Sequence, residues 1–275
     1  MQNILPTVRT AATRTDPRIA LFYSIPKLGK TTEMAKLDGN LILDTERGTE
    51  LIEALKIPIS SINGPTSFRP DDTLEYTSLD SVINRITENG KAVFAATGKK
   101  PKAPYKFITV DTIDKMEEMC EVTATQKYKA STIGKTFTGN SVIELPNGAG
   151  YYHLRNEVLL YIDTLCMICE HLILISHIRE KNINKGGIDV SVADISLTGR
   201  LGAMVAAKCD VIGYMYREPK KPLMVSFETL DNSVMGARVP RLAGKRMPFD
   251  WHQIFTGSDV KVIGEQEAAP ADIAV

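Results

Sequence analysis

The sequence predicts an α/β fold in which a mainly parallel sheet is flanked by helices, with an antiparallel hairpin extension near the carboxyl end. From Arg18 onward, short apolar runs alternate with amphipathic segments that have helical spacing. The run NLILD (40–44) is apolar on both faces, as a strand buried in a parallel sheet is. The runs DVIGYMYR and PLMVSFETL, separated by EPKK, have the pattern of two paired antiparallel strands.

The individual elements are predicted in chain order from the same patterns. Strands are expected at 19–23, 40–44, 107–111 and 172–176, where β-rich apolar residues cluster. Helices are expected at 29–37, 49–55, 78–89, 112–128, 153–169 and 201–207. Gly39 can end the first helix in a left-handed conformation. The polar segment 181–194 is expected to form a loop.

Three regions are expected along the chain. Residues 1–17 are polar and threonine-rich, and residues 265–275 are acidic and small, so both are predicted to be flexible or disordered. Residues 18–264 contain no internal repeat and are predicted to form one domain with a carboxy-terminal extension.

The charge balance excludes a globally basic surface of the kind that constitutive nucleic-acid binders carry. Lys plus Arg and Asp plus Glu are equal at 33 each, so any nucleic-acid contact must come from local patches. No run approaches the roughly 18 apolar residues that a membrane span needs, and the first residues lack a secretion-signal pattern. We therefore expect no membrane association and a cytoplasmic location.

Four cysteines lie inside apolar runs, at Cys120, Cys166, Cys169 and Cys209. Cys166 and Cys169 have C-x-x-C spacing, but no second pair completes a zinc site. They are interpreted as core thiols, because free cysteine is among the most buried residue types.

The segment SIPKLGKT (24–31) carries the strongest functional signal. It follows an apolar strand and opens a helix, the context in which G-x-x-x-x-G-K-[ST] forms a phosphate cradle. Backbone N–H groups would surround the β-phosphate, Lys30 would reach the β and γ oxygens, and Thr31 would coordinate Mg²⁺. The alternative is a surface turn that contains G-K-T. The expected nucleotide contacts are Ser24, Ile25, Pro26, Lys27, Leu28, Gly29, Lys30, Thr31 and Thr32.

Ser24 stands where this motif has its first glycine. A serine Cβ resists positive φ, so the turn is expected to be slightly recast at this position.

Two acidic segments are candidates for the metal and for the attacking water. FITVD (107–111) ends in Asp111, which is predicted to belong to the metal shell and could also cap the next helix. LILDTE (41–46) places Asp44 and Glu46 just past a buried strand, and strand alternation would point both the same way. Glu46 lies farther toward the rim and is the predicted catalytic base, the alternative being a solvated loop acid beside Arg47.

The strand 172–176 leads into His177, at the predicted rim of the same sheet. A polar residue there could sense the γ-phosphate and pass its state to the following loop. The alternative is a loop histidine with local hydrogen bonds.

Taken in order, these motifs resemble the RecA family, and more closely the phage-encoded RecA-like nucleotide-binding proteins, some of which anneal single strands in recombination. IPKLGKTT is similar to the phosphate loop, LILDTE to the strand that ends in the catalytic glutamate, and FITVDT to the metal-binding strand. LILISHIREK is similar to the strand of the γ-phosphate sensor, with His177 in place of a glutamine. The resemblance covers about residues 18–216 and implies a RecA-like P-loop NTPase core that uses ATP and Mg²⁺.

The resemblance also implies contact with single-stranded DNA and a homo-oligomer with the nucleotide between subunits. A single-strand-binding protein would be a further partner. Loop 181–194 corresponds to one DNA-facing loop, and the glycine-rich stretch 134–150 to the other. Phe137, Tyr151 and Tyr152 are available to stack on bases. The candidate DNA-binding cations are Lys127, Lys129, Lys135, Lys181 and Lys185.

A neighbouring subunit would then have to supply cations to the transferring phosphoryl group. The segment ARVPRLAGKR (237–246) holds four cations, of which Arg238 and Arg241 are the trans-acting candidates. Trp251, with Phe249 and Phe255, is interpreted as a packing anchor for the last segment rather than as a base-stacking site.

Three functions are compatible with these residues. The preferred one is a DNA-stimulated ATPase that acts in recombination or strand annealing. The second is an ATP-dependent DNA-binding or loading module that turns ATP over very slowly. The third is a small-molecule P-loop kinase, which would need an arginine-rich lid and an acceptor pocket.

Overall fold

The computed structural model describes residues 7–99, 105–185, 188–229, 233–257 and 260–264, and for 181–192 it describes the backbone alone. One sheet runs through the molecule in the order β12-β10-β9-β1-β7-β6-β2-β3-β5-β4, with β11 paired to β9 and β8 to β7. The strands are β1 (Ile19–Ser24), β2 (Asn40–Asp44), β3 (Leu55–Ser61), β4 (Ser67–Phe68), β5 (Leu74–Ser78), β6 (Tyr105–Asp111), β7 (Cys169–Lys185), β8 (Ile188–Ile195), β9 (Val211–Arg217), β10 (Leu223–Ser226), β11 (Gly236–Ala237) and β12 (Arg246–Pro248).

The centre of the sheet is parallel and its carboxy-terminal edge is antiparallel. Strand β1 lies between β7 and β9, and β6 lies between β7 and β2, all in parallel pairs. Strands β10, β11 and β12 pair antiparallel at the β9 side. The predicted fold class is therefore confirmed, including the antiparallel hairpin of β9 and β10.

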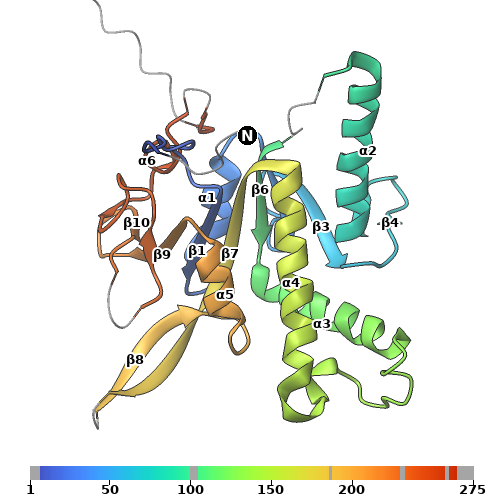
Figure 1. Cartoon of the computed structure of the whole chain (residues 1–275). Coiled ribbons are helices and arrows are strands. Elements are labelled where there is room, and N and C mark those ends of the chain that lie inside the picture. Colours follow the sequence, from blue (N-terminus) through green and yellow to red (C-terminus); the bar gives the residue numbers. More distant parts are fainter. Residues whose placement is uncertain (1–6, 100–104, 186–187, 230–232, 258–259, 265–275) are drawn as a thin grey trace, which may run out of the picture.

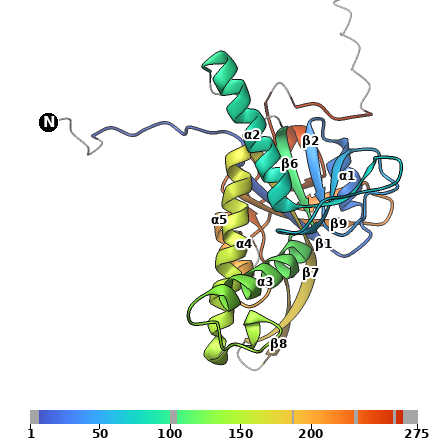
Figure 2. The ribbon, with the colours of Figure 1, turned by 90° about the vertical axis from the view of Figure 1, so that its right-hand side faces the viewer.

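Helices cover both faces of this sheet (Figures 1 and 2). Apolar side chains of α2, α3, α4 and α5 pack on one face, around Leu21, Ile108 and Leu172. On the other face, α1, α6 and the carboxy-terminal segment pack around Phe22 and Ile173. The helices are α1 (Lys30–Lys36), α2 (Leu79–Thr97), α3 (Ile113–Ala130), α4 (Ala149–Ile168), α5 (Leu201–Lys208) and α6 (Trp251–Ile254), with the 3₁₀ turns η1 (Val142–Glu144) and η2 (Pro146–Gly148).

Coverage on both faces explains why the central strands are apolar without alternation. All residues of β1 and of β2 are buried. The ends of parallel strands then gather at one edge, and Asp44 pairs in register with Asp111 there. This edge positions the candidate site.

Two local predictions were wrong. The helix expected at 49–55 is a turn followed by β3, and Leu51 in that segment is fully exposed, so no apolar face holds a helix there. The loop expected at 181–194 belongs to an antiparallel ribbon in which Ile178–Lys185 of β7 pair with Ile188–Ile195 of β8. The ribbon projects from the body of the molecule (Figure 1). In the first place pairing of β3 with β2 overrides local composition, and in the second two neighbouring segments pair with each other as a hairpin.

The end of the amino-terminal segment is anchored, in contrast to the prediction of flexibility through residue 17. Asp16 Oδ1 accepts hydrogen bonds from Arg241 Nη2 at 2.7 Å and from Thr256 N at 3.0 Å. His171 Nδ1 lies 2.7 Å from the carbonyl oxygen of Pro17. The predicted disordered tail, 265–275, lies outside the described residues.

The prediction of core thiols is confirmed for three of the four cysteines, Cys166 being half-buried, and the prediction for Trp251 is confirmed. All four cysteines are free thiols, and three of them, Cys120, Cys169 and Cys209, are buried. No cluster of metal-ligating side chains was found within the described residues. Trp251 is buried among Phe22, Phe249 and Phe255.

None of the described helices combines the length and the apolar composition that crossing a membrane requires.

Candidate nucleotide-binding site

The loop between β1 and α1 has the backbone of an anion-binding turn. Lys27 has φ 60° and Gly29 has φ 107°, so two residues of the loop are left-handed. Such turns present consecutive backbone N–H groups to an anion, and α1 begins immediately afterwards, adding its positive end. Gly29 is required because a side chain at φ 107° is strained.

Ser24 does not adopt positive φ, which agrees with the predicted recasting of the turn. It is fully buried at the end of β1, and its hydroxyl group accepts a hydrogen bond from Lys30 Nζ at 3.0 Å. The hydroxyl also donates to Ile25 O at 2.9 Å. Ser24 thus adds an acceptor inside the loop that a glycine would lack.

Lys30 is a buried cation without a carboxylate partner among the described residues. Its side chain is directed into its own loop, where Nζ donates to Ser24 Oγ and to Ile25 O at 3.1 Å. Burial lowers the pKa of Lys30, and the charges of Asp111, Asp114 and Glu46 oppose this effect. A buried ammonium group that contacts only neutral oxygens is suited to an anionic ligand.

Thr31 and Asp111 meet across the edge of the sheet. Thr31 Oγ1 donates to Asp111 Oδ2 at 2.5 Å, which joins the first turn of α1 to the end of β6. Burial, with the nearby carboxylates of Asp44 and Glu46, raises the pKa of Asp111 to about 6, against the hydrogen bond from Thr31 and the charge of Lys30. A buried carboxylate in a negative environment is suited to a divalent cation.

Glu46 lies over the start of α3. Its Oε1 accepts a hydrogen bond from Thr112 Oγ1 at 2.7 Å and lies 3.8 Å from His177 Nδ1. The second oxygen, Oε2, makes no hydrogen bond to the described residues. Glu46 is therefore held at one oxygen, at the same edge as Asp111.

Asp44 does not point with Glu46, contrary to the prediction from strand alternation. Its carboxylate accepts backbone N–H groups of Glu46, Gly48 and Thr49 at 3.2, 3.1 and 3.0 Å and so braces the turn after β2. Strand β2 ends at Asp44, and Arg47 has φ 59°, so the alternation of a strand does not continue to residue 46.

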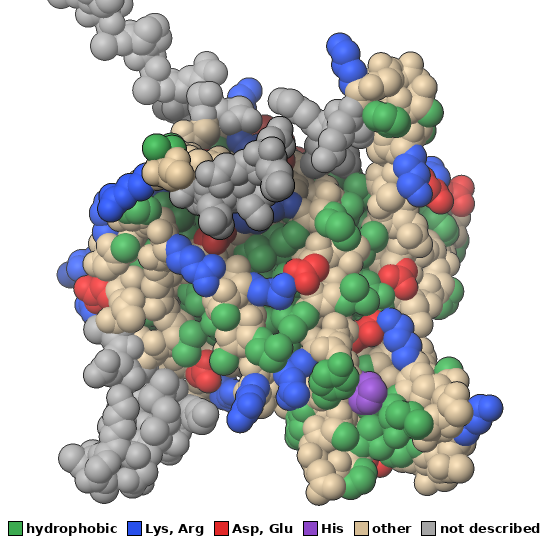
Figure 3. All heavy atoms as spheres, in the orientation of Figure 1, with side chains coloured by type: hydrophobic (Ala, Val, Ile, Leu, Met, Phe, Trp, Pro, Cys, Tyr) green, Lys and Arg blue, Asp and Glu red, His purple; other side chains and the backbone are tan. Residues whose placement is uncertain are grey.

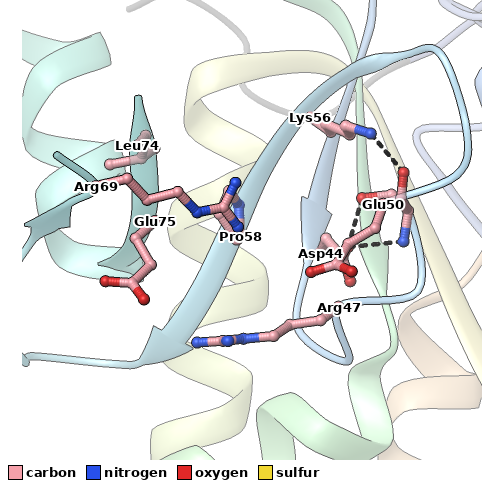
Figure 4. Close-up of a pocket in the computed structure, with 9 residues that line it drawn as sticks. Asp44, Arg47, Glu50, Lys56, Pro58, Arg69, Leu74 and Glu75 are labelled. Atoms are coloured by element: carbon pink, nitrogen blue, oxygen red, sulfur yellow. Dashed lines mark hydrogen bonds between the residues drawn. The ribbon is translucent and has the colours of Figure 1, made fainter. Parts of the chain in front are cut away.

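A cavity of about 370 Å³ lies on the other side of this turn, between β2, β3 and β5 (Figure 4). Arg47 and Arg69 extend toward it, and Arg47 lies over the ring of Tyr76 at 5.9 Å. No residue of the loop 24–31 lines it, so it is distinct from the phosphate-binding loop. The lining residues are Asp44, Arg47, Thr49, Glu50, Lys56, Pro58, Arg69, Leu74 and Glu75.

His177 lies at the rim, as predicted, and a residue that the sequence reasoning missed holds it there. Asp114 Oδ2 accepts the backbone N–H of His177 at 2.7 Å and lies 3.0 Å from the ring Nδ1. Asp114 Oδ1 accepts from Ser176 Oγ at 2.6 Å. The position of Asp114 three residues after Asp111 was the available signal, but its partner is 63 residues away in sequence.

Arg217 was also missed. It ends β9, and its Nε donates to Leu28 O at 3.3 Å, while its Nη2 lies 3.5 Å from where a Cβ of Gly29 would stand. No ion pair engages this side chain within the described residues. An arginine against the phosphate-binding loop is a further candidate contact for a nucleotide.

The candidate DNA-binding lysines differ in their surroundings. Lys127 forms an ion pair with the buried Glu157 at 2.5 Å, and Lys129 lies 5.8 Å from the ring centroid of Phe137. Lys135 is exposed beyond α3. The side chains of Lys181 and Lys185, in β7, lie outside the described residues.

Arg238 and Arg241 lie at the opposite edge of the sheet from the phosphate-binding loop. Arg238 donates to Ala207 O at 2.6 Å and lies 3.7 Å from Asp210, which precedes β9. Arg241 donates to Asp16, Gln253 and Ile254 of its own chain and so tethers the carboxy-terminal segment. Its guanidinium group is engaged within its own chain, which does not favour it as a trans-acting cation.

These residues fit a magnesium nucleotide. Lys30 offers an unpaired buried cation beside a turn of backbone N–H groups, and Thr31 with Asp111 offers a hydroxyl and a carboxylate. Magnesium is commonly held by this donor set together with phosphate oxygens.

Comparison with known proteins assigns the family. Among solved structures, the chain is similar to one described as "Crystal structure of the RadB recombinase", with 14% identity, a TM-score of 0.32, and coverage of 77% of this chain and 81% of that chain. No curated protein matches the chain. The family model described as "AAA domain" matches residues 16–249. Because this match covers most of the sequence, and because it includes the phosphate-binding loop, Glu46, Asp111 and His177, the chain belongs to the AAA domain family.

Proposed function

We propose that this protein binds Mg-ATP at the loop 24–31 and hydrolyses it. The observation that carries the proposal is the contact of Thr31 Oγ1 with Asp111 Oδ2 at 2.5 Å, beside the buried Lys30. The hydroxyl and ammonium groups of α1 and the carboxylate at the end of β6 together are the groups that a magnesium nucleotide requires. Membership of the AAA domain family supports the same proposal.

Each side chain of the site would have a separate role in hydrolysis. Lys30 would exchange its loop acceptors for phosphate oxygens, and Thr31 and Asp111 would hold the metal. Bound magnesium supplies charge neutralisation to the phosphoryl group. Glu46, fixed at Oε1 by Thr112, would use Oε2 to orient a water molecule and accept its proton. His177, 3.8 Å from Glu46, would respond to the γ-phosphate.

We further propose that ATP turnover serves an action on single-stranded DNA in recombination or strand annealing. Two projecting segments support this, the β7–β8 ribbon and the end of α3, which lie on the same side of the molecule in both views (Figures 1 and 2). Lys129 and Lys135 are exposed near the second segment. Contacts of this kind go mainly to phosphates and weaken with salt.

An ATPase assay with and without single-stranded DNA tests both proposals, ATP hydrolysis and the action on DNA. We expect turnover that requires Mg²⁺ and rises when DNA is added, together with retention of DNA on a filter at low salt. Turnover that DNA leaves unchanged, without DNA retention, would contradict the recombination role. Very slow turnover with ATP-dependent DNA retention would favour the loading module instead.

Glu46→Gln is expected to keep ATP affinity and to lower kcat by about 10²-fold or more, because the amide cannot accept the proton of the attacking water. Lys30→Ala is the matched control and is expected to abolish Mg-ATP binding itself. Binding of a fluorescent ATP analogue and steady-state phosphate release measure the two effects. Normal turnover of Glu46→Gln would reassign the base.

The cavity of Figure 4 favours a small-molecule kinase as the second candidate. Arg47 and Arg69 line it, and Arg47 directly follows Glu46 in the sequence. An acceptor pocket for an anionic substrate would have such cations. The stoichiometry of products separates the two candidates. An ATPase releases one inorganic phosphate for each ADP formed, whereas a kinase forms ADP in the presence of an acceptor without releasing phosphate.

A further inference from the structure

Asp114 makes three contacts with the two residues that lead out of the sheet toward the ribbon. Its Oδ1 accepts the Ser176 hydroxyl at 2.6 Å, and its Oδ2 faces both the backbone N–H of His177, at 2.7 Å, and the ring Nδ1, at 3.0 Å. The carboxylate side chain is 16% exposed, so little solvent competes for it. One side chain thus defines both the backbone position and the ring orientation of His177.

The contacts determine which ring nitrogen of His177 carries the proton. An ionised carboxylate only accepts hydrogen bonds, so Nδ1 must donate to Asp114. The neutral ring then carries its lone pair on Nε2, which makes no hydrogen bond to the described residues. A histidine held at Nδ1 in this way presents Nε2 in a constant orientation and state.

Asp114 is also built into the element that carries the metal side of the site. It stands in the first turn of α3, three residues after Asp111, with only Thr112 and Ile113 between them. Thr112 holds Glu46, and Asp114 holds His177. The start of α3 therefore sets the positions of the metal carboxylate, the base and the histidine relative to one another.

We propose that Asp114 is a positioning residue for ATP hydrolysis, which fixes His177 in the Nδ1–H form so that Nε2 is the nitrogen offered to the nucleotide. This inference rests on the proposed function, because His177 acts there on the γ-phosphate. Asp114 itself touches no reacting atom.

The tautomer is the first test and does not depend on activity. Long-range ¹H–¹⁵N spectra recorded at about pH 8 distinguish Nδ1–H from Nε2–H rings. The chain has four histidines, and the His177 signals are those lost in His177→Gln. We expect the Nδ1–H form in the wild-type protein and in Asp114→Asn, whose carbonyl oxygen can accept both His177 donors. Asp114→Ala is expected to shift to the Nε2–H form that free histidine prefers, and an unchanged tautomer in this variant would overturn the proposal.

The second test separates positioning from general stability. We expect Asp114→Ala to lower kcat about 10- to 100-fold, the usual effect of removing a group that orients a functional histidine, with unchanged ATP affinity. Asp114→Asn should restore most of kcat, and Glu118→Gln, on the exposed face of the same helix, should match the wild type. In a His177→Ala background, Asp114→Ala should cause no further loss.

The outcomes are distinguishable from failure of the proposed function. A wild-type protein without turnover would refute hydrolysis, and the tautomer measurement would still test the placement of His177. A wild-type protein with turnover, in which Asp114→Ala and His177→Ala lower kcat independently, would overturn the positioning role alone. Unfolding by urea verifies that each variant compared is folded.

Discussion

Asp111 and Lys30 are opposite charges that the fold buries without a direct ion pair among the described residues. Lys30 is 6% exposed, and so is Asp111. Burial lowers the pKa of the lysine and raises that of the aspartate, so both shifts record a free-energy cost of the charged form. Buried charges that cost stability in the free protein, and that a ligand with both a cation and an anion would compensate, are typical of a functional site rather than of a structural ion pair.

Asp111→Asn is expected to stabilise the protein without nucleotide. The folded-state pKa of about 6 exceeds the ordinary aspartate value of 3.8, so the folded state binds more protons between these values and stability falls as pH rises through them. Above about pH 6 the wild type carries the full cost, which is at most about 3 kcal/mol. Urea unfolding at pH 7.5 should show Asp111→Asn to be more stable, and the difference should shrink toward pH 4.

The same substitution should remove the thermal stabilisation that Mg-ATP gives the wild type, because an amide is a poor ligand for magnesium. Thr31→Val is a control at the other side of the contact, and should lose the nucleotide effect without gaining the pH-dependent stability. An Asp111→Asn protein that is less stable at pH 7.5 would show that the charge is compensated in the folded state.

At the scale of elements, the short helix α6 connects the end of the described chain to the phosphate-binding helix. Trp251 Nε1 donates to Glu33 O in α1 at 2.9 Å, and the indole ring contacts Phe22 of β1 edge-on with centroids 6.0 Å apart. Arg241 and Asp16 tie the neighbouring segments together. The carboxy-terminal extension therefore supports α1 from the face opposite to α3 and α4.

Trp251 substitutions should separate packing from the hydrogen bond. Trp251→Phe keeps an aromatic ring and loses the N–H donor, so we expect a loss of about 1 to 2 kcal/mol in the free energy of unfolding. Trp251→Ala also leaves a cavity and should cost about 3 to 5 kcal/mol. Urea denaturation measures both, with His252→Ala as an exposed neighbour. Equal losses for the two substitutions would contradict the packing role.

The ribbon of β7 and β8 is held at its base by the same helix that holds the site. Ser196 N donates to His177 O at 3.1 Å, and Thr198 N lies 3.1 Å from each carboxylate oxygen of Glu117. Asp114 of α3 thus contacts β7 where the ribbon begins, and Glu117 contacts the segment that follows β8. A movement of His177 would therefore displace the base of the ribbon, because Ser196 is hydrogen-bonded to its carbonyl oxygen.

For the whole molecule, the placement of Arg238 bears on the proposed oligomer. This residue lies at the edge where the parallel strands begin, whereas the phosphate-binding loop lies where they end. A single chain cannot bring the two together, so Arg238 could reach only the site of a neighbour. Leu160, Met167 and Met204, in α4 and α5, are exposed apolar side chains and add surface that a second copy could cover. Apolar side chains lie scattered over the face shown in Figure 3.

A mixing experiment tests the trans role of Arg238. Arg238→Ala and Glu46→Gln should each be inactive in hydrolysis, and their mixture should recover up to about a quarter of wild-type activity. This is the share of interfaces in a random mixture that join an intact Glu46 to an intact Arg238. Phosphate release measures recovery, and a mixture of Glu46→Gln with Lys30→Ala, Arg238→Ala double-mutant chains is the control. A mixture that stays inactive, with assembly shown by light scattering, would exclude Arg238.

Local sequence was sufficient for the elements that depend on neighbouring residues. The loop 24–31, its strand and its helix follow from a turn motif between an apolar run and a helical segment, and Asp111 follows from an apolar run that ends in an acid. Trp251 among aromatic residues was recognisable as an anchor. In parallel strands all carboxyl ends face one edge, so the sequence could predict that Thr31 and Asp111 lie close together, although not the distance between them.

What only the tertiary structure decided are the contacts between residues far apart in sequence. The strand β3, the pairing of Asp114 with His177 and the approach of Arg217 to Leu28 have no local signal, because each depends on a partner brought near by the sheet. The ribbon pairs two neighbouring segments, and the prediction of a loop there missed the hairpin pattern around Gly186 and Gly187. Asp44 and Glu46 diverged because the strand ends at Asp44, where its carboxylate binds the following backbone. Sequence by itself determined the kinds of chemistry present, since these reside in short motifs, whereas the fold decided which groups share a site, since strand pairing sets those distances.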